Sequence, residues 1–89
     1  MRIKDDYVVK DILGSIVIIP IGQNYINKVE NIYLNSEGAF FVRNIKAGKN
    51  EEEIADLYAD LFSEDIDDAR YELTKFVENG VAKGFLEKN

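Results

Sequence analysis

Carboxylates are the side chains that gather most clearly in positions where they could do chemistry. Three stand together at 51–53, and three more are Asp65, Asp67 and Asp68. Paired carboxylates can act as general acid and base, or hold a divalent cation. Each group, however, opens a predicted helix, where the helix dipole favours negative charge. The second group also lacks the Gly and the distal Glu of an EF-hand loop, so both patterns indicate helix starts.

The other residue types that enzymes use are missing or isolated. The chain contains no His, the commonest general base, and no Cys. Gly14 and Gly22 are single turn glycines rather than a phosphate-binding loop, and no Ser or Lys has a candidate base beside it. We therefore expect a protein that is not an enzyme and has no cofactor and no metal. A small enzyme that uses carboxylates alone stays open as an alternative.

Length and charge narrow the class of protein further. The 89 residues make one domain with one modest core, and 46% hydrophobic residues are too many for a disordered chain. Residues 1–50 hold seven Lys and Arg against five acids, whereas residues 51–89 hold four against twelve, for a net charge of −6. Nucleic acid is bound by neutralising phosphates with Lys and Arg. We therefore expect no nucleic-acid partner.

The N-terminus and the hydropathy pattern carry no sign of a membrane or export signal. The first six residues have mixed charge, and no apolar stretch follows them. The longest apolar run, at 16–21, is far shorter than the roughly 20 residues that span a bilayer. We expect a cytoplasmic protein without membrane contact.

Two runs rich in Val and Ile, at 7–13 and 16–21, predict two strands. Gly14-Ser15 between them predicts a two-residue hairpin turn, because Gly readily takes a positive φ. Pro20 donates no hydrogen bond, so it belongs at an edge or at the end of its strand.

A third strand is predicted at 28–34, after a polar connector at 23–27. Alternate residues of a strand point to opposite faces, which places Ile32 and Leu34 on one face. The other face carries Val29, Asn31 and Tyr33. Charged residues on this strand discourage indiscriminate pairing, and an open but guarded edge suggests a specific guest strand.

The second half predicts three helices, at 36–47, 51–62 and 66–82. Asn35 or Ser36 caps the first, and Asn50 caps the second with Glu53 completing a capping box. Apolar residues recur at helical spacing on each, which predicts their buried faces. These residues are Ala39, Phe40, Val42 and Ile45; then Ile54, Leu57, Tyr58, Leu61 and Phe62; then Ile66, Ala69, Leu73, Phe76 and Val77.

The end of the third helix has two candidates, Gly80 and Gly84, because glycine is favoured just after a helix. Gly84 is the preferred one, and Phe85 and Leu86 would then fold back on the core. Three strands followed by three helices define an α+β domain, a small antiparallel sheet with helices packed on one face.

Short motifs along nearly the whole chain resemble the PqqD-like family, also called RiPP recognition elements. The resemblance implies a three-stranded antiparallel sheet followed by a three-helix, winged-helix-like unit. The most specific motif is Leu34-Asn35 leading into Gly38-Ala39. The residues that carry the resemblance are Tyr7-Val8-Val9-Lys10-Asp11-Ile12-Leu13-Gly14, Ile18-Ile19-Pro20-Ile21-Gly22, Ile32-Tyr33-Leu34-Asn35 with Gly38-Ala39-Phe40, Glu52-Glu53-Ile54, and Lys83-Gly84-Phe85-Leu86.

The resemblance implies a site as well as a fold. Members of the family bind the leader segment of a ribosomally made precursor peptide, which adds as an antiparallel strand to the third strand and lies against the third helix. Such strand addition gains affinity from main-chain hydrogen bonds and selectivity from side-chain pockets. Carried onto this sequence, the peptide-binding residues are Lys28, Val29, Glu30, Asn31, Ile32 and Tyr33 of the strand, and Arg70, Tyr71, Thr74, Lys75 and Glu78 of the helix.

The partners implied by the resemblance are a precursor leader peptide and a modifying enzyme acting in trans, of the radical-SAM maturase or lasso-peptide protease class. An exposed edge strand allows either a monomer or a dimer paired through that edge. The alternative function is a winged-helix-like nucleic-acid-binding or regulatory domain. Its recognition helix, at 65–79, would carry five acids against two bases, which argues against it.

Overall fold

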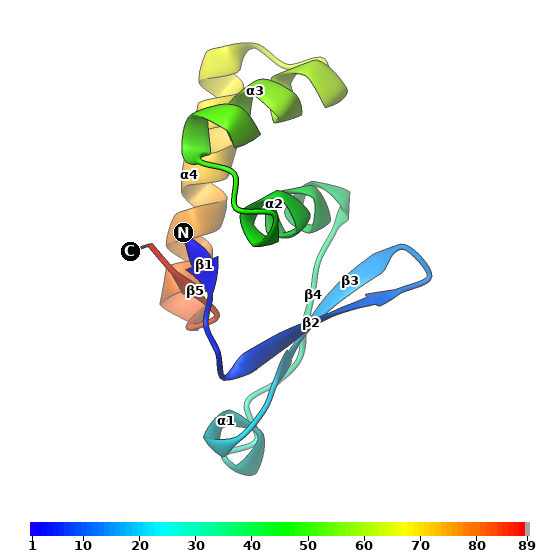
Figure 1. Cartoon of the computed structure of the whole chain (residues 1–89), viewed down its shortest axis with the longest axis vertical. Helices are drawn as coiled ribbons and strands as arrows, with labels where there is room; N and C mark the ends of the chain where they lie inside the picture. The colour runs from blue at the N-terminus through cyan, green and yellow to red at the C-terminus, as the bar shows by residue number, and fades with distance from the viewer. Residues whose placement is uncertain (89) are drawn as a thin grey trace.

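A computed structural model describes residues 1–88 of the chain, and its elements form an α+β domain (Figure 1). The elements in chain order are β1 (Arg2–Ile3), β2 (Tyr7–Ile12), β3 (Ser15–Pro20), α1 (Gln23–Ile26), β4 (Ile32–Tyr33), α2 (Ser36–Lys46), α3 (Glu51–Leu61), α4 (Ile66–Lys83) and β5 (Leu86–Glu87). The principal extents are 42 × 30 × 18 Å, and α1 occupies one end of the long axis, away from α3. None of the helices in the described part is long and apolar enough to cross a membrane.

The expected three-stranded antiparallel sheet is present, in the order β2-β3-β4. The hairpin turn differs by one residue from the prediction, because Ile12 pairs with Ser15 and the turn residues are Leu13 and Gly14. Both have positive φ, 54° and 86°, as a type I′ turn requires. The Asp11 carboxylate accepts the Gly14 N–H at 2.9 Å, and this bond fixes the turn at that position.

The third strand is shorter than the sequence predicts, since β4 covers only Ile32–Tyr33 rather than 28–34. The segment expected to be a polar connector forms the short helix α1. Its carbonyl groups accept hydrogen bonds from the first residues of the predicted strand. The Lys28 N–H bonds to the Tyr25 carbonyl at 3.0 Å, and the Val29 N–H to the Asn24 carbonyl at 3.0 Å. Lys28 has a φ of 59°, which an extended strand does not allow.

A second, two-stranded sheet that the sequence did not predict joins the two ends of the described chain. Arg2 pairs with Glu87 and Ile3 with Leu86 across β1 and β5, which the Arg2–Glu87 ion pair at 2.6 Å reinforces. Two-residue strands are too short to show a period in the sequence.

The helices begin and end as predicted to within a residue. Asn35 caps α2, where its side chain accepts the Gly38 N–H at 2.8 Å, and Asn50 and Glu53 form the capping box of α3. Helix α4 runs to Lys83 and ends at Gly84, whose φ of 93° is the left-handed conformation that glycine favours. Gly80 instead lies inside the helix.

The core lies between the helices and the buried face of β3. Phe85 and Leu86 fold back into it as predicted, each only 2% exposed. The predicted buried face of α4 is confirmed, but two predicted core residues of α3, Leu57 and Leu61, are exposed. On α2 the fully buried ring belongs to Phe41, and Phe40 is half-buried.

Candidate functional site

The outer edge of β4 is open. Tyr33 pairs with Val17 and Ile32 with Ile18, and the Leu34 N–H bonds to the Ile16 carbonyl at 3.1 Å. Residues in an antiparallel ladder direct their main-chain groups alternately to the two sides. The main-chain N–H and C=O groups of Ile32 and Leu34 therefore face β3. Those of Asn31 and Tyr33 point to the open side.

The open edge faces the first of two depressions along α4, which share no lining residue. The lower one, of ≈ 510 Å³, lies between β4 and the last turn of α4, and the upper one, of ≈ 340 Å³, lies between α4 and the start of α2. We call the two together the edge groove, and refer to them as its lower and upper parts. The lower part is lined by Val29, Glu30, Asn31, Ile32, Tyr33 and Lys83, and the upper part by Asn35, Glu37, Gly38, Phe41, Glu72, Lys75, Phe76, Glu78 and Asn79.

Gly38 allows α2 to begin close to α4 at the upper part of the groove. A Cβ atom at this position would lie 3.3 Å from the Phe76 ring and 3.3 Å from the Leu34 Cβ, which is tighter than ordinary packing. The asparagine cap beside it starts the helix directly after β4. This local sequence therefore places strand, helix start and α4 around one groove.

The strand residues predicted to bind peptide divide into two groups. Asn31, Ile32 and Tyr33 lie on the edge itself, and the Tyr33 side chain is 75% exposed. Lys28, Val29 and Glu30 precede the strand, and the Val29 N–H is already bonded within the chain. The predicted row of six main-chain partners is thus reduced to the outward groups of Asn31 and Tyr33.

Of the predicted helix residues, Lys75 and Glu78 line the upper groove. Tyr71 is 62% exposed and is outside the groove lining, and the Lys75 Nζ lies 5.1 Å from its ring centre in a cation–π contact. Thr74 is exposed and lies outside the groove lining. It is four residues from Arg70, and so on the same side of the helix.

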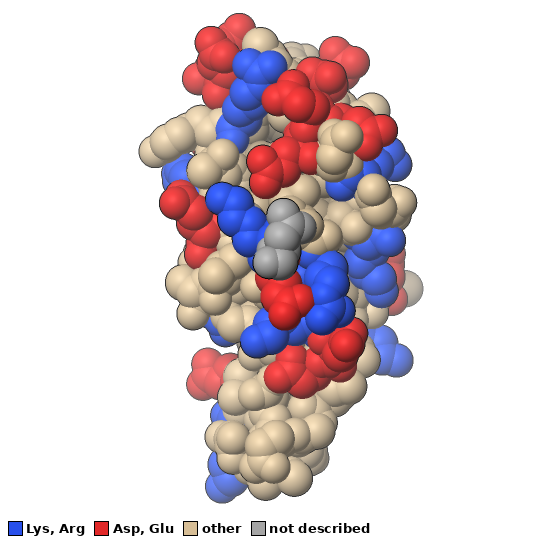
Figure 2. All heavy atoms as spheres, turned by 60° about the vertical axis from the view of Figure 1, so that its left-hand side comes forward, with Lys and Arg blue, Asp and Glu red and all other residues tan. Residues whose placement is uncertain are grey.

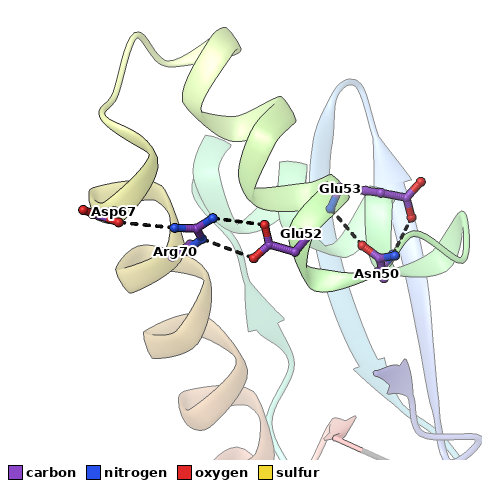
Figure 3. Close-up of polar contacts among 5 residues, drawn as sticks. All are labelled: Asn50, Glu52, Glu53, Asp67 and Arg70. Carbon is purple, nitrogen blue, oxygen red and sulfur yellow. Dashed lines mark hydrogen bonds and ion pairs between the residues drawn. The ribbon is translucent and has the colours of Figure 1, made fainter.

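Arg70 lies on the side of α4 that faces α3, away from the groove. Its Nε and Nη2 atoms donate to the two carboxylate oxygens of Glu52 at 3.2 and 3.1 Å, and its Nη1 lies 3.3 Å from Asp67 (Figure 3). The hydrogen bond with Glu52 is the main reason that the pKa of Arg70 is raised. Figure 3 also shows the capping box that Asn50 and Glu53 form at the start of α3. Glu53 belongs to the carboxylate cluster at 51–53, which therefore lies at a helix start as the sequence predicts.

The structure adds groove residues that the sequence analysis missed. On α4 these are Glu72, Phe76, Asn79 and Lys83. Their spacing of four, three and four residues marks one helical stripe beside the buried row. This spacing was a signal in the sequence, but the side of α4 that meets β4 is decided by the packing of α2 and α3.

Charge is segregated along the molecule. Figure 2 shows Asp and Glu gathered at the end formed by α3 and the start of α4, mixed charges around the chain ends, and few charges at the α1 end. The upper part of the edge groove is acidic on balance, with Glu37, Glu72 and Glu78 against Lys75, whereas Glu30 and Lys83 balance each other in the lower part. Within residues 1–88, no group of three or more carboxylates is placed to hold a metal ion.

Comparison with known proteins identifies the fold. Neither a family model nor a curated protein matches the sequence. Among solved structures, TbiB1 in complex with the TbiA(beta) leader peptide matches with a TM-score of 0.87. The match covers 100% of this chain and 98% of that chain at 24% sequence identity. The chain therefore has the same fold as TbiB1.

Proposed function

We propose that this chain is a non-catalytic module that captures the leader segment of a ribosomally made precursor peptide. The leader adds as a strand to the open edge of β4, and the module presents it to a separate modifying enzyme. The observation that carries the proposal is this open edge facing a groove, in a fold shared with a protein whose structure contains a leader peptide.

The groove has the parts that strand addition needs. The outward N–H and C=O groups of Asn31 and Tyr33 supply main-chain hydrogen bonds, which hold any extended peptide. Side chains then supply selectivity, and here Phe76 offers an apolar surface between acidic and basic residues of the groove. The proposal assigns binding and not catalysis to this chain, whose sequence has no His and no Cys.

The reaction on the precursor belongs to the partner enzyme in this proposal. An enzyme of the radical-SAM maturase class or of the lasso-peptide protease class is compatible with this proposal, because the module only binds the leader. The same edge could pair with a second copy of the chain, so leader and second copy would compete for it.

A fluorescence-anisotropy titration tests the proposal. The probe is the labelled leader peptide of the precursor encoded beside this chain, and the competitor is an unlabelled leader of scrambled sequence. We expect saturable binding that the scrambled peptide does not displace. Absence of binding up to high micromolar concentration, or equal displacement by both peptides, would contradict the proposed function.

A further inference from the structure

Large apolar side chains are exposed together at the α1 end of the molecule. Three of them, Tyr25, Ile26 and Val29, line one depression and have exposed fractions of 72, 68 and 37%. We call these three residues the α1 platform. Helix α1 buries none of its own residues, and an apolar cluster that a small domain keeps exposed is typical of an interaction site.

Hydrogen bonds hold the α1 platform in place. The Ile26 N–H bonds to the Gly22 carbonyl at 3.1 Å, and the bonds of Lys28 and Val29 to α1 close the segment. The Asn24 amide donates to the Asp6 carboxylate at 2.6 Å, which ties α1 to the start of β2. A surface that is ordered before binding loses less conformational entropy when a partner arrives.

The α1 platform is continuous with the edge groove. A depression of ≈ 500 Å³ lies beside it, lined by Ile19, Pro20, Tyr25, Ile26, Lys28, Val29 and Asn31. Val29 and Asn31 also line the lower part of the edge groove. A peptide lying along β4 therefore reaches the α1 platform without leaving the surface.

The short edge of β4 favours such an extension. Within the described β4 segment, the outward main-chain groups that its register with β3 defines are those of Asn31 and Tyr33. Side-chain contacts must then add to the affinity that these few main-chain bonds give a guest.

We propose that the α1 platform is a second subsite for the leader peptide, resting on the function proposed above. It binds an apolar side chain of the leader just beyond the segment that pairs with β4. Lys28 is the one charged residue among the described residues that line the depression, so it selects a carboxylate beside that apolar side chain.

The test compares variants in the leader titration. Tyr25→Ser with Ile26→Ser removes two exposed side chains, and we expect the Kd to rise about tenfold or more. Leu61→Ser is the matched control, because Leu61 is equally apolar, 64% exposed and on α3, and we expect its Kd to stay within about twofold of the unmodified chain. Lys28→Asn removes the charge but suits the left-handed backbone, and we expect a rise of about threefold at low salt that disappears at high salt.

The outcomes separate this inference from the proposed function. Unchanged affinity in the Tyr25→Ser, Ile26→Ser variant, with circular dichroism showing an intact fold, overturns the subsite while leader binding stands. An equal loss in the Leu61→Ser control also overturns it. Failure of the unmodified chain to bind the leader overturns both.

Discussion

At the scale of single residues, Tyr58 shows how burial in the core changes the pKa of a side chain. Its ring is 3% exposed and stacks on Phe41 and Phe62, with centroids 4.9 and 4.5 Å apart. Burial, and to a smaller extent Glu72, Glu64 and Glu37, raise the pKa of Tyr58 above its usual 10. The folded state thus disfavours the phenolate.

The raised pKa predicts a loss of stability at high pH. The unfolded chain releases the Tyr58 proton first, so the contribution is fully present below about pH 10 and is lost as the pH rises above it, by at most about 1.4 kcal/mol for each pH unit. Urea unfolding between pH 8 and 11 measures it. The Tyr58→Phe variant should lose stability less steeply above pH 10, and identical slopes would contradict the explanation.

At the scale of elements, β4 carries the proposed function, and a proline tests it. Tyr33→Pro removes an N–H that points to the open side and takes no part in the β3–β4 ladder. Tyr33→Ala removes the same ring but keeps the N–H, so it is the matched control. We expect the proline variant to bind leader more weakly than the alanine variant by about 1 kcal/mol, measured by anisotropy.

The result depends on an intact fold, which thermal unfolding of both variants checks. Ile32→Pro provides the contrast, since the Ile32 N–H faces β3 and its loss should lower the melting temperature. Equal leader affinity for Tyr33→Pro and Tyr33→Ala would show that the leader does not use the main chain of β4.

The elements also show what the sequence could predict. Helix starts and ends follow from local chemistry, namely the Asn35 and Asn50 caps and the left-handed Gly84, so they could be predicted to within a residue. The strands depend on distant pairing. The segment at 28–34 has the pattern of a strand, but the N–H groups of Lys28 and Val29 form hydrogen bonds with α1, so these residues do not join the sheet.

The candidate site was only partly predictable for the same reason. Asn31 and Tyr33 follow from the alternation of the strand. Lys75 lines the groove, whereas Arg70 lies against α3, because the side of α4 that faces β4 is a property of the packed helices. The residue pattern of one helix does not predict which of its sides faces β4.

At the scale of the whole molecule, the three-stranded sheet has two open edges within the described chain, and only one is proposed to bind the leader. The outer side of β2 directs the main-chain groups of Val9 and Asp11 outward, since Ile12 and Ser15 close the hairpin as a hydrogen-bonded pair. The edge of β4 differs because it faces α4 across the edge groove. The β2 edge is therefore an internal control for strand addition.

An NMR titration of the ¹⁵N-labelled chain with the leader peptide tests the central claim most directly. We expect the Tyr33 amide to shift and to become protected from hydrogen exchange at saturation, while the amides of Val9 and Asp11 do not change. An unperturbed Tyr33 amide at saturation, or protection at the β2 edge instead, would contradict it.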